Sequence, residues 1–166
     1  YEKSFFAGGS SSVRAWRPRR LGLGSFNADL FEGEGEWDPE RLDNINKPEQ
    51  PGDILLEASI EYRDKLVGFV DWAFFVDAGN VWKANQIYGA GEDFDLRRFY
   101  REIAVGSGLG LRLNFSFLII RFDAGVKLWD PERPDGDRFV GRFINWNRLL
   151  GKPGQTIWNI AIGYPF

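Results

Sequence analysis

The chain has 166 residues and a formal net charge of -3, which argues against a nucleic-acid partner. It has no Cys, so the sequence indicates no disulfide framework and no thiolate metal site. It also has no His, which is the commonest general base and the commonest metal ligand, and we expect no catalytic residue, metal or cofactor. No apolar run approaches the roughly 18 residues of a membrane helix. Seven Trp and 20 Gly in a chain of slightly negative mean hydropathy are instead typical of a membrane β-barrel, in which only alternate residues face lipid.

The first 52 residues lack a strand period, and we interpret them as a long loop and a following insert. They contain the sequence SSSVRAWRPRR, in which four arginines fall within seven residues: Arg14, Arg17, Arg19 and Arg20. From the residues alone, this segment is either a solvated loop or a cationic finger that must meet buried carboxylates. Because the chain contains no Met, Tyr1 cannot be an initiator residue, and we expect the chain to be the C-terminal part of a longer protein.

Five later segments alternate apolar and polar side chains with period two, which predicts strands rather than helices. Each has about ten residues or more, longer than the usual strand of soluble proteins and close to the roughly 9–11 residues of a tilted membrane strand. The predicted barrel region therefore spans residues 53–166, with strands at about 53–64, 67–82, 101–113, 116–128 and 156–166.

The two faces of each predicted strand differ in chemistry. In the second strand, Trp72 and Phe74 share one face, whereas Asp71 and Asp77 lie on the other. An apolar face toward lipid and a polar face toward an aqueous lumen explain this pattern. We interpret the lumen-side aspartates, including Asp123, as partners of lumen arginines and lysines rather than as a metal or acid–base cluster.

Glycines also gather on the predicted lumen face of the third strand. Gly106, Gly108 and Gly110 form GxGxG, but inside a strand this is no dinucleotide site. We expect these glycines to leave room for a loop or to ease strand curvature.

The predicted connections alternate in length. Residues 63–66 and 114–116 form short turns, and residues 83–101 and 129–155 form long loops, with a short helix expected at 93–101. Short periplasmic turns and long extracellular loops are the arrangement of an outer-membrane barrel. Four tryptophans near strand ends are expected to anchor the barrel at the membrane interfaces: Trp72, Trp82, Trp129 and Trp158.

Several motifs together resemble the BamA/TamA superfamily of outer-membrane assembly and translocation barrels, over essentially the whole chain. Val13-Arg14-Ala15-Trp16 resembles the Val/Ile-Arg-Gly-Phe/Tyr tetrapeptide of the family's lid loop, with Ala15 in place of Gly. FVDAGNVW resembles a Phe-x-Asp strand signature, and GSGLGLR and IRFDAG resemble the next two strands. In the strand signature, the matching residues are Phe75, Asp77, Gly79 and Asn80. At the end of the chain, Gly163, Tyr164 and Phe166 resemble a C-terminal insertion signal.

The resemblance implies an all-β, antiparallel, sixteen-stranded transmembrane barrel, of which this chain supplies the last five strands and the preceding lid loop. It further implies that the lid loop folds into the lumen. Since an unpaired buried charge is costly, we expect Arg14 to pair with Glu61 or Asp77, which share the predicted lumen face, and to tether the loop. The inserts and SIEYRDKL resemble the TamA-like group of Bacteroidetes in particular.

The implied function is non-enzymatic assembly and insertion of client outer-membrane proteins through the lid loop and a seam formed by the last strand. The expected partners are those clients, the remaining strands of the same barrel, periplasmic or lipoprotein subunits, and the lipid bilayer with its lipopolysaccharide. Two alternatives remain open at this stage: a two-partner-secretion translocator of the same superfamily, and a soluble all-β carbohydrate-binding module.

Overall fold

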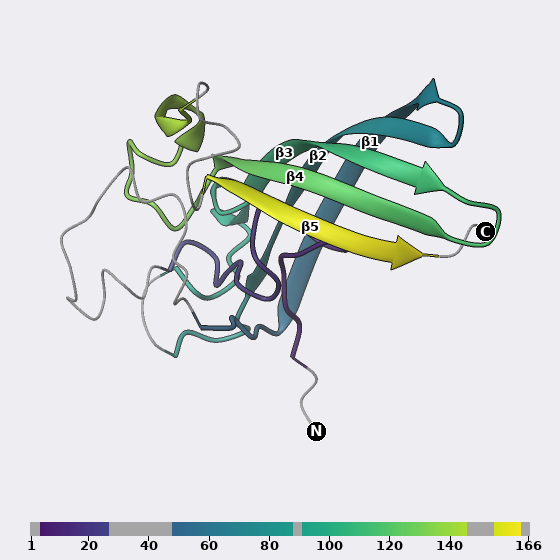
Figure 1. Cartoon of the computed structure of the whole chain (residues 1–166). Helices are drawn as coiled ribbons and strands as arrows, with labels where there is room; N and C mark the ends of the chain where they lie inside the picture. Colours follow the sequence, from purple (N-terminus) through teal and green to yellow (C-terminus); the bar gives the residue numbers. More distant parts are fainter. Residues whose placement is uncertain (1–3, 27–47, 88–90, 146–154, 164–166) are drawn as a thin grey trace.

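The computed structural model describes residues 4–26, 48–87, 91–145 and 155–163. Five strands form one antiparallel sheet in chain order, as Figure 1 shows: β1 (Ile54–Val67), β2 (Val70–Trp82), β3 (Ala104–Asn114), β4 (Ile119–Trp129) and β5 (Thr156–Gly163). Two 3-10 helices, η1 (Phe99–Arg101) and η2 (Val140–Phe143), lie in the long connections. The predicted all-β antiparallel fold is confirmed. Within the described ranges, no helix has the length and apolarity needed to cross a membrane.

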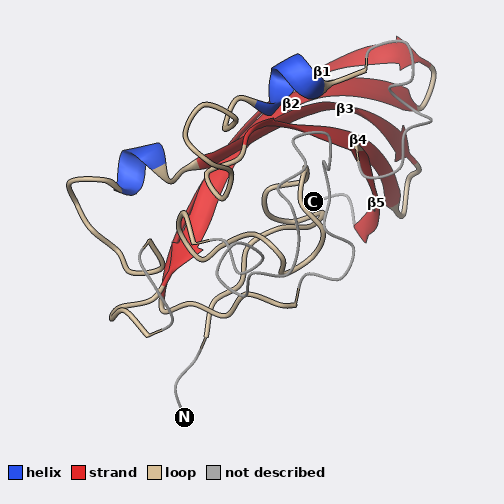
Figure 2. Ribbon diagram, turned by 90° about the vertical axis from the view of Figure 1, so that its left-hand side faces the viewer, coloured by secondary structure: helices blue, strands red, loops and turns tan. Residues whose placement is uncertain are grey.

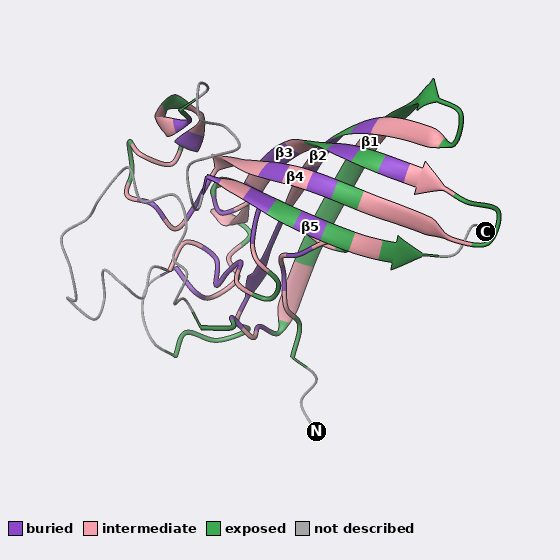
Figure 3. Ribbon diagram, in the orientation of Figure 1, coloured by how far each residue is buried: buried purple, intermediate pink, exposed green. Residues whose placement is uncertain are grey.

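The sheet is curved, and the loop segments gather on its concave side (Figure 2). Side chains alternate between the two faces, so that exposed and buried residues alternate along β5 (Figure 3). Large apolar side chains are exposed on the convex face, among them Ile60, Phe74, Leu109 and Ile160. Asp77 and Phe75 on the concave side are 1% and 0% exposed. The amphipathic pattern thus places most large apolar side chains of the strands on the convex face and buried charged residues such as Asp77 on the concave face.

The described N-terminal loop, residues 4–26, fills the concavity with a small apolar core of its own. Backbone bridges join Ala7 to Leu21 and Phe5 to Gly52, which closes the loop on itself and on the segment before β1. Its buried apolar side chains pack against Val81 of β2 and Ala104 of β3. This packing explains how a loop rich in Ser, Gly and Arg acquires one defined shape.

Three local expectations differ from the structure. The first turn was expected at residues 63–66, but β1 continues to Val67 and the chain reverses at Gly68 and Phe69. Gly68 supplies the reversal because it adopts a left-handed backbone with φ of 56°, which glycine tolerates without steric cost. In the region expected to be a helix at 93–101, only the short η1 is helical.

Trp82 is the third difference. It was expected to anchor the barrel at a membrane interface, but its side chain is fully buried and its Nε1 donates a hydrogen bond to Glu102 at 2.7 Å. The long connection after β2 covers this end of the strand, and Phe94 packs edge-on against the indole ring. Trp158, by contrast, is 58% exposed on the convex face, where the anchoring role remains a prediction.

Candidate functional site

Arg14 is the centre of the site on the concave face. Its Nε and Nη2 atoms each donate to a different oxygen of Asp77 on β2, at 2.8 Å in both cases, which is the fork geometry that favours arginine. The backbone N–H of Arg14 also donates to Asp77, at 3.0 Å. Its Nη1 donates to Glu61 on β1 at 2.5 Å. The structure therefore brings Arg14 to both carboxylates that the sequence singled out.

The guanidinium of Arg14 has further partners on the same two strands. Nη2 donates to Ser59 at 3.3 Å, and the guanidinium carbon lies 3.5 Å above the centre of the Phe75 ring. Burial alone acts to lower the pKa of Arg14, but the hydrogen bonds that Arg14 donates to Asp77 and Glu61 outweigh it and raise the pKa above its ordinary value. Arg14 is therefore a permanent buried cation.

A wider ion network surrounds this pair. Arg112 of β3 donates to Glu61 at 2.9 Å and also contacts Asp123 of β4. Asp123 lies 3.7 Å from Arg14 and 4.0 Å from the half-exposed Arg121. Two buried arginines thus face three carboxylates, with Arg121 at the edge of the group. The paired charges offset much of the desolvation that an isolated buried charge would suffer.

The loop backbone at Arg14 and Ala15 fits against glycines of the sheet. An added Cβ on Gly106 would come 2.4 Å from the Cβ of Ala15, and one on Gly125 would come 2.9 Å from the carbonyl oxygen of Arg14. The side chain of Asn159 on β5 donates to that same oxygen at 2.8 Å. The glycines therefore leave room for the loop, and every one of the five strands takes part in holding it.

A second set of contacts fixes the base of the loop. Asn80, from the strand signature, donates to the carbonyl oxygens of Gly24 at 2.8 Å and Glu102 at 2.6 Å. The Glu102 carboxylate accepts from Ser25 at 3.1 Å and forms an ion pair with Arg98 at 3.0 Å. Burial tends to lower the pKa of Arg98, but its hydrogen bond to Asp93 and the nearby acids raise it.

The remaining residues of the predicted motifs have structural surroundings of their own. Val13 and Trp16 are buried in the loop core, and Lys127 of β4 lies 4.8 Å from the Trp16 ring. Gly79 packs against the backbone of β1, where an added Cβ would come 2.7 Å from the Leu56 oxygen. Gly163 ends β5, whereas Tyr164 and Phe166 lie outside the described residues.

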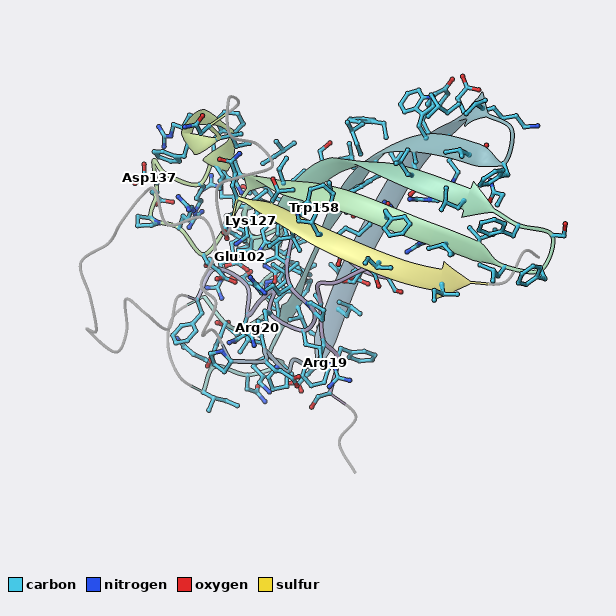
Figure 4. The ribbon with its side chains drawn as sticks, viewed as in Figure 1. Arg19, Arg20, Glu102, Lys127, Asp137 and Trp158 are labelled. Atoms are coloured by element: carbon cyan, nitrogen blue, oxygen red, sulfur yellow. The ribbon has the colours of Figure 1, made fainter. Side chains whose placement is uncertain are left out.

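The other arginines of the loop are more exposed than Arg14. Arg19 is exposed, 3.5 Å from Glu49, and stacks near the Phe6 ring. Figure 4 shows Arg19 and Arg20 in the loop region, whereas Lys127 and Glu102 lie nearer to the strands. Of the four arginines in SSSVRAWRPRR, Arg14 alone is buried, and Arg17, Arg19 and Arg20 keep some contact with solvent.

Sequence reasoning missed several contacts of the site, two of which involve the backbone of the loop. The first is the hydrogen bond of Asn159 to the Arg14 carbonyl oxygen. The alternation placed Asn159 on the polar face of the last predicted strand, but it did not indicate which group Asn159 would contact. The second is the close approach of Gly125 to the Arg14 backbone, which needed the strand register. Asp71 pairs with Asn114 rather than with the central network.

Comparison with known proteins gives one family. Residues 1–163 match the domain described as the Omp85 superfamily domain. No curated protein matches the chain.

Proposed function

Because this chain belongs to the Omp85 superfamily, we propose that its five strands are part of the wall of an outer-membrane barrel that inserts client outer-membrane proteins. The superfamily as a whole supports a protein assembly or secretion barrel in the outer membrane, without enzymatic chemistry. The finer proposal is that residues 4–26 act as the lid loop, that Arg14 tethers it to Glu61 and Asp77, and that β5 forms the seam. Membership in the TamA-like group of Bacteroidetes stays a prediction.

One observation carries the proposal: a single arginine of the loop makes contacts with three different strands. Through its side chain and backbone, Arg14 contacts Glu61 on β1, Asp77 on β2 and Asn159 on β5. A solvated surface loop needs no such buried, paired charge. A loop that sets the shape of the barrel wall during client insertion does need a fixed position.

The seam is proposed at β5 because of its position in the sheet. Among the described residues, β5 pairs with β4 alone, so its other edge offers backbone N–H and C=O groups. Such an edge can template an incoming strand by backbone pairing. With the long connections outside the cell, the client strand would enter from the periplasmic side. The partners follow: client barrels, the other strands of the same barrel, periplasmic or lipoprotein subunits, and the lipid and lipopolysaccharide around them.

Arg14→Ala tests the tether directly. Removing one member of a desolvated ion pair leaves buried Asp77 and Glu61 without their cation, at a cost of about 3–5 kcal/mol. We therefore expect the full-length barrel to unfold at lower temperature on heating before electrophoresis. Arg19→Ala is the matched control, because Arg19 is exposed and its ion pair with Glu49 spans 3.5 Å. Equal heat stability of the two variants would contradict the tether.

The insertion activity needs a separate measurement. The full-length protein in lipid vesicles should accelerate the folding of an unfolded client barrel, scored as the fraction that resists heat and detergent. Arg14→Ala should lose this acceleration, and Arg19→Ala should keep it. Passage of an unfolded polypeptide into the vesicle lumen, with no gain in client folding, would instead favour the two-partner-secretion alternative.

A further inference from the structure

Two adjoining pockets lie where the ends of β3 and β4 meet the long connections. One has a volume of about 450 Å³ and is lined mainly by apolar side chains. The other, of about 340 Å³, is lined by three arginines together with aromatic residues and Asp135. Trp129 and Phe139 line both pockets, so the two form one continuous surface. No part of the lid-loop site contributes to it.

A bulge in β4 places the apolar pocket on the convex side of the sheet. Gly106 pairs with Lys127 but Val105 pairs with Trp129, so Leu128 is an extra residue in β4. A bulge of this kind bends the strand and re-aims its side chains. Both Leu128 and Trp129 therefore line the pocket together with Val105, which shares the convex face with the exposed Leu109.

Aromatic rings complete the apolar pocket. Phe99 and Tyr100 of η1 line it together with Phe139, and the Tyr100 and Phe139 side chains are 58% and 53% exposed. Rings with a polar atom or an exposed edge are common at the level of lipid headgroups. The pocket is thus an open apolar slot at the rim of the convex face.

The second pocket adds positive charge next to that slot. It is lined by Arg101, Arg138 and Arg142. Within the described residues Arg101 has no carboxylate partner; it stacks on Tyr100, with its guanidinium carbon 5.6 Å from the ring centre. Arg138 and Arg142 form surface pairs with Asp135 at 3.3 Å and with Asp137 at 2.9 Å. In each pair at least one member is exposed to solvent, Asp135 to 91% and Arg142 to 46%, so solvent screens the pairs and a stronger anion can replace the carboxylate. Arg138 is 20% exposed and also donates to the carbonyl oxygen of Arg133 at 3.2 Å.

We propose that this surface binds a phosphorylated lipid of the outer leaflet. An acyl chain lies between Phe99, Leu128 and Phe139, and the phosphate meets the guanidinium groups, which suit phosphate oxygens because of their planar fork. The charge explains why the occupant is an anionic lipid rather than any hydrocarbon. This inference rests on the proposed function, since it requires the long connections to face the outer leaflet.

The test measures binding of lipid A to the full-length barrel in phosphatidylcholine nanodiscs, by quenching of tryptophan fluorescence with a brominated acyl chain. Arg101→Gln with Arg142→Gln should weaken binding by about tenfold or more, since hydrogen bonds to charged groups are the stronger kind. Phe139→Ala should also weaken it. The matched controls are Arg97→Gln and Leu96→Ala, which alter exposed residues of the connection before β3 that line neither pocket.

Each outcome decides one point. Weaker binding in the pocket variants with unchanged controls supports the site. Equal affinity for dephosphorylated lipid A overturns the phosphate as the recognised group, whereas full displacement by inorganic phosphate at its lipid-free affinity overturns the lipid as the occupant. Unchanged affinity in the pocket variants overturns the site. If the wild-type chain forms a heat-resistant barrel but binds no lipid A, this inference fails and the proposed function stands; if it forms no such barrel, the proposed function itself fails.

Discussion

At the scale of residues, the fit between the loop and the sheet depends on one pair of Cβ positions. Ala15 stands where the lid loops of the similar family carry Gly. Its Cβ lies against Gly106, so the missing side chain of Gly106 leaves room for the methyl group of Ala15. An added methyl group on Gly106 would meet the Ala15 Cβ at 2.4 Å, while its next neighbours stand at 3.4 Å. Gly106→Ala should therefore displace the loop, at about 1–3 kcal/mol for overpacking.

A compensating change isolates this contact. Ala15→Gly combined with Gly106→Ala removes the clashing methyl group and should restore heat stability close to that of Ala15→Gly alone. The measurement is a double-mutant cycle on barrel unfolding. Additive losses in the double variant would show that Gly106 is required for another reason, such as strand curvature. Gly108→Ala offers no such rescue, because its Cβ would come 2.1 Å from the backbone oxygen of Ala124.

The partners of the buried Arg14 could be predicted only in part from the sequence. Period two placed Glu61 and Asp77 on one face, and the motif resemblance brought Arg14 to them. The same alternation predicted that Asp123 pairs with lumen arginines, but not that Arg112 would link Asp123 to Glu61, because that depends on the register of the strands. The Phe75 ring under the Arg14 guanidinium was equally out of reach.

At the scale of elements, a side-chain hydrogen bond joins β5 to the loop. Asn159 is 7% exposed and donates to the Arg14 carbonyl oxygen, while the backbone of β5 pairs with β4. Asn159→Ala leaves that buried oxygen unsatisfied, which costs about 1–3 kcal/mol. We expect the amides of β5 to exchange hydrogen faster by about tenfold or more, while those of the β1–β2 hairpin stay unchanged.

Ile160→Ala is the control for this measurement, since Ile160 is 68% exposed on the convex face and lies beside Asn159 in the same strand. Equal exchange in both variants would show that backbone pairing alone holds β5. A disulfide lock of the seam should be placed at another residue than Asn159, because a cysteine there would remove this contact as well.

Elements were the most predictable level of this structure. Alternation identified all five strands, since a sheet with one apolar and one polar face repeats its pattern at every second residue. It failed at the first turn, where Asp64 and Lys65 have the composition of a turn but continue β1. The reversal depends on the backbone freedom of Gly68, which polarity does not reveal. The long connections have no period and could not be predicted beyond their length.

At the scale of the whole molecule, the sheet combines an apolar convex face with a charged concave face, which is the reverse of a soluble domain. In hydrocarbon, each bare backbone group costs several kcal/mol, so the outer edges of β1 and β5 require partner strands. We propose that the other strands of an Omp85 barrel supply them, with the seam at β5. The curvature of the sheet is consistent with a wall of such a barrel (Figure 2).

The convex face provides the last prediction. Leu109 is 59% exposed near the middle of β3, between Phe74 of β2 and Ala124 of β4. If this face meets lipid, Leu109→Arg should destabilise the barrel in vesicles by about 2–4 kcal/mol, the cost of an arginine near the bilayer midplane. Leu96→Arg, at a residue 75% exposed in the connection before β3, should cost little. Chemical unfolding in vesicles measures both, and equal stability of the two variants would place the convex face in water.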